Sequence, residues 1–161
     1  MSSSSPFPAG PDHAEVETPF EINVILAYES LSAALWAAET LTGLLRRISG
    51  GAEPRLSPWS FSTLENPALR PHATAAAVAA DLIVITTSSG FSVLPASVES
   101  WLGKSLAERR HATTAVAALF GQPNRPDRAD SPRLQTVQRL ARDAGCEFFA
   151  PQVTEAILTV A

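Results

Sequence analysis

One apolar run followed by a polar loop most constrains what this chain can fold into. Residues 82–85 are apolar and mostly β-branched, and the polar loop 86–90 follows them directly. Such a run is typical of a central strand that is buried on both faces, where polar and apolar residues need not alternate. Pro95 comes next and suits the first turn of a helix, because no backbone N–H is needed there. The order strand, polar loop, helix predicts the carboxyl edge of a parallel sheet, where α/β proteins bind ligands.

The rest of the chain repeats this alternation. We predict strands at residues 21–28, 55–61, 82–85, 113–120 and 146–150. Helices are predicted between them, at residues 30–49, 66–80, 95–110 and 131–144. Pro58 places the second strand at an edge, since proline cannot donate to a central ladder. We therefore predict an α/β fold, a three-layer α/β/α sandwich with a five-stranded parallel sheet in the flavodoxin-like order 2-1-3-4-5.

The first helix has a clear periodic pattern. Ser30 or Ser32 would cap its N-terminus, and the glycines at 50 and 51 would end it. Its apolar residues recur at steps of three and four, which predicts a continuous stripe packed on the sheet: Leu31, Leu35, Ala38, Leu41, Leu45 and Ile48. In the third helix, Trp101 lies beside the apolar stripe, and we expect it at the margin of the core.

Length and composition predict one domain. We place it at residues 20–161, after a Ser- and Pro-rich tail at 1–19 that we expect to be disordered. The sequence has no apolar run of the roughly 18 residues that a membrane span needs and no secretory signal. Its single cysteine, Cys146, agrees with a cytoplasmic location. The net charge of −4 argues against nucleic-acid binding, although residues 104–142 contain eight basic and three acidic residues, which would suit an anionic partner.

The central stretch resembles the flavodoxin-like NAD(P)H-dependent FMN reductases. In that family an Ala-Asp pair opens the third strand and an Ile/Leu-Pro pair opens the next helix, as Ala80-Asp81 and Leu94-Pro95 do here. The strand at 115–121 and the Arg-rich helix after it are also similar to the family. The resemblance extends over residues 22–151. It implies the same architecture, an FMN cofactor and a reductase activity.

Two loops depart from the family's pattern. The family's first strand-to-helix loop is extended and rich in Ser, Thr and Gly, and its N–H groups surround the FMN phosphate. Here residues 28–32 contain no glycine, and Glu29 would oppose a phosphate by about 1–4 kcal/mol. The family's second loop, Pro-Glu-Tyr-Asn-Gly, contacts the flavin ring, whereas residues 88–92 here are Ser-Ser-Gly-Phe-Ser. We therefore predict no cofactor, with FMN as the alternative, in which Phe91 would stack on the ring.

Other chemistries lack their residues. A two-component receiver domain shares this strand order but needs an acidic cluster, a phosphorylatable Asp after the third strand and a Lys after the fifth; only Glu29 matches. No Gly-x-Ser-x-Gly motif is present, and the three histidines and one cysteine do not have metal-ligand spacing. We therefore predict no catalytic and no metal-ligating residue.

These observations favour a binding or regulatory module over an enzyme, acting as a homo-oligomer or with a protein partner. Trp59 on the edge strand is the candidate for self-association. The alternatives are a small-anion binder and a divergent FMN- or nucleotide-dependent oxidoreductase. The pocket of such an oxidoreductase would lie between loops 88–93 and 121–130, and Ser30, Ser32, Arg125 and Arg128 would hold phosphate. The candidate ligand-binding residues are Glu29, Ser30, Ser32, Ser88, Ser89, Gly90, Phe91, Gln122, Asn124 and Arg125.

Overall fold

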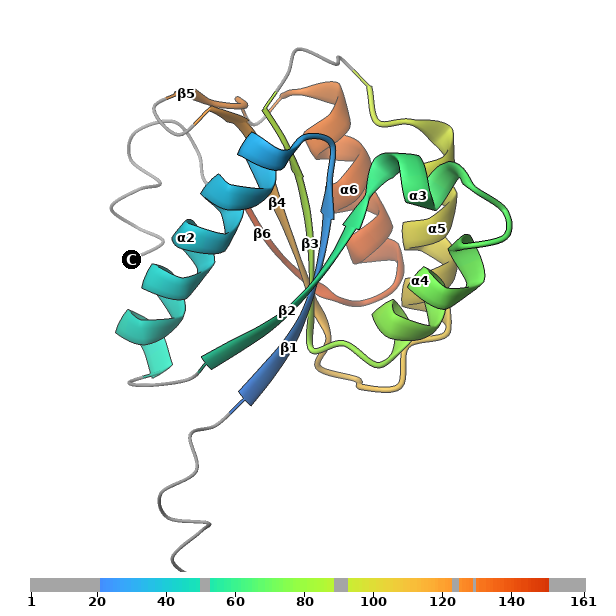
Figure 1. Ribbon diagram of the computed structural model, residues 1–161, viewed down its shortest axis with the longest axis horizontal. Coiled ribbons are helices and arrows are strands. Elements are labelled where there is room, and N and C mark those ends of the chain that lie inside the picture. Colours follow the sequence, from blue (N-terminus) through green and yellow to red (C-terminus); the bar gives the residue numbers. More distant parts are fainter. Residues whose placement is uncertain (1–20, 50–52, 89–92, 123–124, 129, 151–161) are drawn as a thin grey trace, which may run out of the picture.

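A twisted sheet with helices on both faces forms the fold (Figure 1). The structure is a computed structural model, and it describes residues 21–49, 53–88, 93–122, 125–128 and 130–150. The predicted tail at 1–19, the glycines at 50 and 51 and the segment after residue 150 lie outside these ranges. The strands are β1 (Glu21–Tyr28), β2 (Glu53–Ser60), β3 (Leu82–Thr87), β4 (Ala115–Gln122), β5 (Arg125–Pro126) and β6 (Glu147–Phe149).

The strand order confirms the predicted flavodoxin-like arrangement. Parallel pairing joins β2 to β1, β1 to β3, β3 to β4 and β4 to β6. The prediction of a five-stranded, all-parallel sheet was wrong, because β5 adds a sixth strand that pairs antiparallel with the end of β4. The edge position of β2 is confirmed, as Pro58 suggested.

A glycine explains how the extra strand forms. Gly121 has a φ of 94°, a conformation that side chains with a Cβ rarely adopt, and it lets the chain turn back directly after β4. Gly121 then pairs with Pro126, and Gln122 pairs with Arg125. The sequence suggested only a polar loop at 121–130, because the two-residue strand β5 is too short to have a pattern of its own.

We expect Gly121→Ala to lower the free energy of unfolding by about 1–3 kcal/mol. An added Cβ would lie 2.6 Å from the carbonyl oxygen of Arg125, so β5 must also shift. The matched control is Gly103→Ala on a helix, where the new Cβ meets only the Leu140 side chain at 3.8 Å. The control should raise the stability by about 0.5–1 kcal/mol. Urea unfolding measures both changes, and equal effects would contradict the strain at Gly121.

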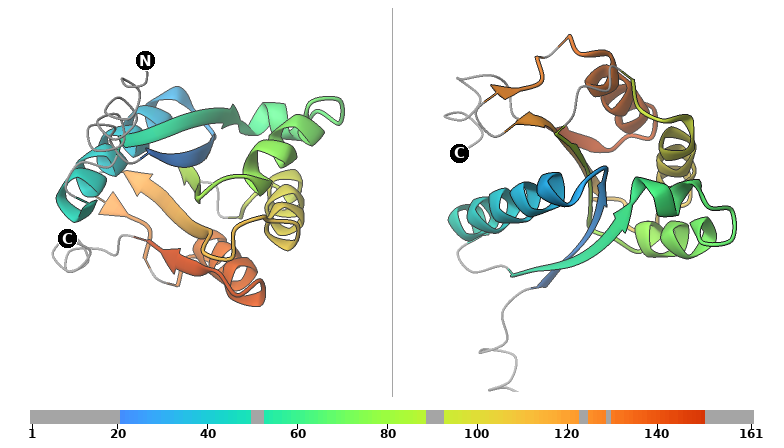
Figure 2. Two further views of the ribbon diagram at one scale, coloured as in Figure 1. Left: turned by 90° about the horizontal axis from the view of Figure 1, so that it is seen from below. Right: turned by 45° about the horizontal axis from the view of Figure 1, so that its top comes forward.

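The helices divide unequally between the two faces of the sheet. Helix α2 (Leu31–Ser49) lies on one face. The others lie on the opposite face (Figure 2): α3 (Phe61–Glu65), α4 (Arg70–Val78), α5 (Ala96–Ala107) and α6 (Pro132–Asp143). Helix α3 was not predicted; it begins because the Ser60 side chain accepts the N–H of Thr63. The predicted cap of α6 is confirmed, since Ser131 accepts the N–H of Leu134 and Pro132 follows at the first helical position.

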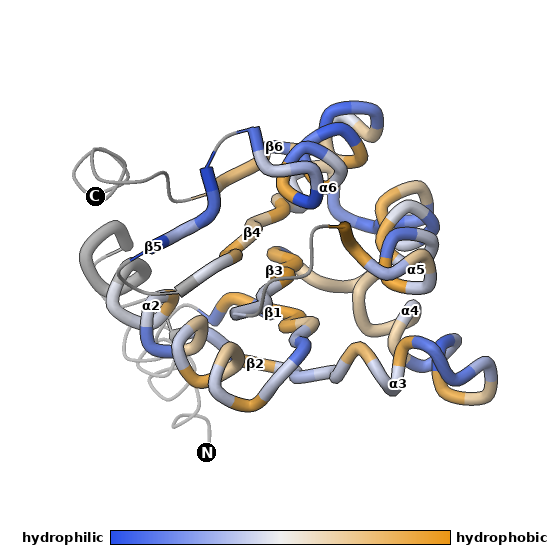
Figure 3. The backbone as a smooth tube through the Cα atoms, turned by 90° about the horizontal axis from the view of Figure 1, so that it is seen from above, coloured by the Kyte–Doolittle hydropathy of each residue, from blue (hydrophilic) through white to orange (hydrophobic). Residues whose placement is uncertain are grey.

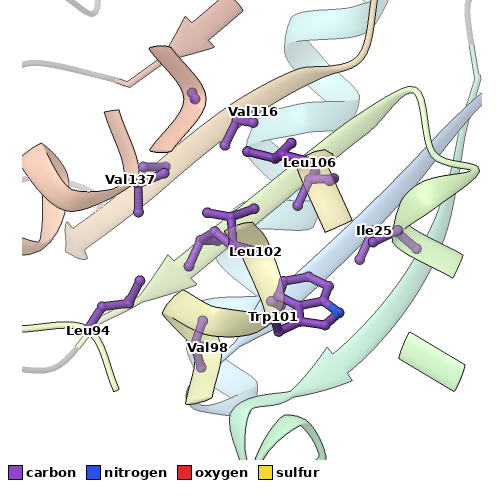
Figure 4. Packing of buried hydrophobic residues seen from close by; sticks show 14 of the residues in the cluster. Ile25, Leu94, Val98, Trp101, Leu102, Leu106, Val116 and Val137 are labelled. Carbon is purple, nitrogen blue, oxygen red and sulfur yellow. The ribbon is translucent and has the colours of Figure 1, made fainter. Parts of the chain in front are cut away.

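The larger part of the core lies under α3 to α6. Figure 4 shows how Val98, Trp101 and Leu102 of α5 pack over the sheet. Trp101 is 1% exposed, so the prediction that it lies at the core margin was wrong. Figure 3 shows that apolar residues concentrate on the central strands β1, β3 and β4, as their burial on both faces requires. No helix among the described residues is long and apolar enough to cross a membrane.

Helix α2 packs on the sheet through small side chains. Its buried residues are Ala33, Ala34, Ala37 and Leu41. The predicted stripe was therefore wrong in its first turns, because Leu31 is 68% exposed and Leu35 is 62% exposed. Both the alanines and the leucines recur at helical spacing, so periodicity alone could not decide between the two faces. Of the predicted stripe, Leu41 is buried, and the side chains of Leu45 and Ile48 lie outside the described part.

Candidate functional site

The candidate site lies where the strand order reverses. Successive strands extend from β1 to β2 on one side and from β3 to β4 on the other, so β1 and β3 are neighbours at the crossover. Tyr28 pairs with Thr86, and both strands end within two residues of this pair. In open α/β sheets ligands bind beside the carboxyl ends of strands at such a point.

A carboxylate lies at this crossover. The Thr87 hydroxyl, on a residue 1% exposed, donates a hydrogen bond to Oε1 of Glu29. The backbone N–H of Glu29 donates to the carbonyl oxygen of Thr86 at 3.2 Å. The first contact joins the Glu29 side chain to β3, and the second fixes its backbone to the same strand. The negative charge of Glu29 is thereby held at the carboxyl edge between β1 and β3.

Three serine hydroxyls complete what we call the crossover cluster, which consists of Glu29, Ser30, Ser32, Thr87 and Ser88. Oγ of Ser30 accepts the N–H of Ala33 at 3.3 Å, so Ser30 is the cap of α2. The same oxygen lies 3.2 Å from Oγ of Ser32 and 3.4 Å from Oγ of Ser88. The N-terminus of α2 is thus capped by a side chain of this protein.

The structure brings four of the ten predicted site residues together, namely Glu29, Ser30, Ser32 and Ser88. Ser89, Gly90, Phe91 and Asn124 lie outside the described residues, as does the side chain of Gln122. Arg125 is exposed on β5. Sequence reasoning missed Thr87 as a partner of Glu29. Its position in the polar loop that follows the apolar run was the only available signal.

A second polar group lies at the carboxyl end of β4, in the segment that connects to α6. Nε and Nη2 of Arg133 donate to the two carboxylate oxygens of Asp127 at 2.7 and 3.0 Å. The Ser131 hydroxyl donates to the same carboxylate at 2.8 Å. The Arg133 guanidinium also lies over the Phe120 ring, with its carbon 5.1 Å from the ring centre. This bidentate pair fixes the start of α6 against the end of the sheet.

The Asp127 carboxylate is stabilised in its charged form. Burial raises its pKa, but the hydrogen bonds from Arg133 and Ser131 and the positive charge of Arg133 outweigh this effect, so the pKa lies below its usual value. Arg133 is 4% exposed, and its charge is balanced by this one carboxylate among the described residues. Arg133 therefore has a structural partner. Arg125 and Arg128 are exposed, and Arg128 lies 3.8 Å from Asp130.

The remaining reactive side chains have no arrangement typical of catalysis in the part of the chain that the structure describes. Burial raises the pKa of the Cys146 thiol, and the charge of Arg109 offsets only part of that, so the reactive thiolate is disfavoured. His72 and His111 are exposed. The described residues include no group of three or more His, Cys, Asp or Glu that could hold a metal ion. A hollow of about 560 Å³ lies away from the crossover cluster, between α4 and α5.

Comparison with known proteins shows a likeness in the course of the backbone. No protein-family model and no curated protein matches the sequence. Among solved structures, the chain is similar to an NADH:FMN oxidoreductase, EmoB, in its apo form, with 15% identity and a TM-score of 0.49 over 86% of this chain and 84% of that one. The strand order β2-β1-β3-β4-β6, in a sheet covered on both faces by helices, is what identifies the fold of this protein as flavodoxin-like.

Proposed function

We propose that the protein is a binding module with a flavodoxin-like fold whose crossover edge does not hold a flavin phosphate. The observation that carries this proposal is the hydrogen bond from Thr87 to the carboxylate of Glu29. It keeps a negative charge beside the N-terminus of α2, which is the place where a phosphate would use the helix amides. The protein then acts through association with other molecules and not through redox chemistry.

Electrostatics and capping both oppose a phosphate here. Two like charges about 4 Å apart repel by about 1–4 kcal/mol at the effective dielectrics of water and of a protein surface. The Ala33 N–H already has Ser30 as its acceptor, so it is not available to a ligand unless Ser30 moves. A phosphate would have to displace the hydrogen bond from the Ala33 N–H to Ser30 and overcome the repulsion from the Glu29 carboxylate. Hydroxyl and carboxylate oxygens instead suit ligands that donate hydrogen bonds.

The first test is the absorbance spectrum of freshly purified protein, followed by titration with FMN and a thermal-shift screen with FMN, FAD, NADH and ATP. We expect no absorbance near 450 nm, about where oxidised flavins absorb, and no change in Tm. Any ligand that binds the folded state would raise Tm by mass action. A yellow protein, or FMN-dependent oxidation of NADH, would establish the oxidoreductase alternative and refute the proposal.

We expect Glu29→Gln to increase the affinity for FMN by at least about fivefold, because it removes a repulsion of about 1–4 kcal/mol. FMN fluorescence quenching at protein concentrations up to the millimolar range measures the constant of the variant, and we expect the wild type to show no saturation in that range, so the gain is measured against this limit. The matched control is Glu147→Gln, which removes the same charge from the exposed start of β6 at the opposite edge of the sheet. An equal gain in both variants would show a general charge effect. No gain in Glu29→Gln would contradict the role given to this carboxylate.

A further inference from the structure

Helix α2 presents two large apolar side chains to solvent. Leu31 and Leu35 are 68% and 62% exposed and lie one turn apart. The other exposed large apolar residues among those described, Leu69, Val93 and Phe149, lie singly on other elements. Scattered single residues are normal on a protein surface, but an adjacent pair on one helix calls for an explanation.

The two leucines belong to a seam with the spacing of paired helices. Leu31, Leu35, Ala38 and Thr42 follow one another at steps of four, three and four, which is the spacing of residues that face a partner helix in a coiled coil. We call these four residues the α2 seam. The seam has large side chains in its first half and small ones in its second half. A shallow hollow of about 390 Å³ lies at the small end, lined by Ala38, Glu39, Thr42 and Gly43.

We propose that the α2 seam is the contact surface of a homodimer in which the α2 helices of two copies pack antiparallel about a two-fold axis. Such an interface must be self-complementary, since the same surface occurs on both sides. When Leu35 of one copy lies against Ala38 of the other, Leu31 falls against Thr42. Both large residues then meet small ones, and the symmetry repeats each contact. Because the large and the small residues of the seam lie on the same helix, the surface is complementary to a second, antiparallel copy of itself.

The register keeps the acidic residues beside the seam apart. Glu39 lies at the rim of the seam, and the register places it level with the turn of the second copy that contains Ser32 and Leu35. The two Glu39 residues are then offset by about 7 Å along the helix axis. In this register residues 31–42 of the two α2 helices lie side by side, over about 18 Å or roughly three turns.

This surface replaces Trp59 as the site of self-association. The Trp59 side chain is partly buried against the larger core cluster, and its indole N–H donates to Oγ of Ser57 at 3.2 Å. It is therefore engaged within its own chain. The α2 seam shares no residue with the crossover cluster, but Leu31 lies between Ser30 and Ser32, so the dimer begins beside that cluster.

Analytical ultracentrifugation of the full chain, at about 1 to 200 µM, tests the dimer. We expect wild-type protein to dimerise and Leu35→Glu to weaken the association by at least about 100-fold, because the variant buries a carboxylate without a partner. The control is Val93→Glu, which changes a residue 63% exposed in the segment before α5 and should dimerise like wild type. At protein concentrations low enough for the wild type to be monomeric, thermal unfolding of Leu35→Glu should match that of the wild type, since that side chain lies mostly in solvent within one chain.

The register has its own test. Ala38→Lys should also prevent self-association, because its long side chain would meet Leu35. Mixing the Leu35→Glu and Ala38→Lys proteins should restore a dimer, because the introduced carboxylate of one chain then faces the introduced ammonium group of the other. A monomeric wild type, or a dimer that survives Leu35→Glu, would overturn the proposed surface. Monomeric variants that do not combine would overturn the register.

Discussion

Asp127→Ala should lower the free energy of unfolding by about 3–5 kcal/mol, whereas Arg133→Met should lower it by less than about 2 kcal/mol. The two partners of this ion pair differ in what their loss leaves behind. The Arg133 side chain is 5% exposed, so removing Asp127 leaves a buried charge without the carboxylate that pairs with it. The Asp127 side chain is 17% exposed and keeps the Ser131 hydroxyl, so removing Arg133 allows water to reach the carboxylate. Methionine also retains contact with Phe120.

Urea unfolding of the two variants measures this asymmetry, and Arg139→Met is a suitable control. Arg139 also pairs with a carboxylate, Glu99 at 3.3 Å, but both side chains are well exposed. Such pairs contribute about 0–1 kcal/mol. Equal losses of stability for Asp127→Ala and Arg133→Met would show that only the attraction between the two charges matters. That result would contradict the argument that the more deeply buried Arg133 depends more on its partner.

The same pair predicts a pH dependence. The pKa of Asp127 is lower in the folded protein than in the unfolded chain, so the unfolded state binds the proton more readily. The stabilisation is present above the unfolded pKa of about 4 and is lost as the pH falls through the lower folded pKa. Wild type should therefore lose more stability than Asp127→Ala between about pH 5 and pH 2. Parallel stability curves for the two proteins would contradict the lowered pKa.

Trp101→Ala should lower the free energy of unfolding by about 3–5 kcal/mol, because it leaves a large cavity under α5. Trp101→Phe should lower the free energy of unfolding by clearly less than the side-chain volume that it removes would suggest. The indole N–H of Trp101 is buried and has no hydrogen-bond partner among the described residues. An unsatisfied buried donor costs about 1–3 kcal/mol, and phenylalanine removes it together with part of the ring.

Trp59→Phe provides the comparison. The Trp59 indole N–H donates to Ser57, so the same substitution there removes a hydrogen bond that is made. We expect a loss of about 0.5–1.5 kcal/mol from that bond alone. A Trp101→Phe protein that is as unstable as Trp101→Ala would contradict the inference that the buried indole N–H of Trp101 destabilises the folded state.

Much of the fold could be predicted from a few residues. The β-branched run before Thr86 identified a central strand, and Pro58 placed its strand at an edge. Ser131 and Pro132 marked the start of α6. These features act through the backbone of neighbouring residues. Their effect on secondary structure is therefore nearly the same in any tertiary structure. The errors arose where the local sequence fits two arrangements equally well. On α2, both the alanines and the leucines recur at helical spacing, and only packing on the sheet decides which of them are buried.

The candidate site was less predictable. Glu29, Ser30 and Ser88 could be placed at one edge because parallel strands end there together. The contact between Glu29 and Thr87 depends on side-chain directions that strand order does not give. The Asp127–Arg133 pair was missed because arginines near a polar loop are usually solvated, and the sequence does not show that the turn at Gly121 folds this segment over Phe120.

A titration of ¹⁵N-labelled protein with FMN, and separately with inorganic phosphate, tests the crossover site most directly. The signals to follow are the backbone amides of Ser30 and Ala33, which lie where a phosphate would bind. We predict that these signals stay unchanged up to millimolar ligand, because the Glu29 carboxylate and the Ser30 cap occupy this place. Saturable shifts of both amides with FMN in the micromolar range would contradict the proposed function.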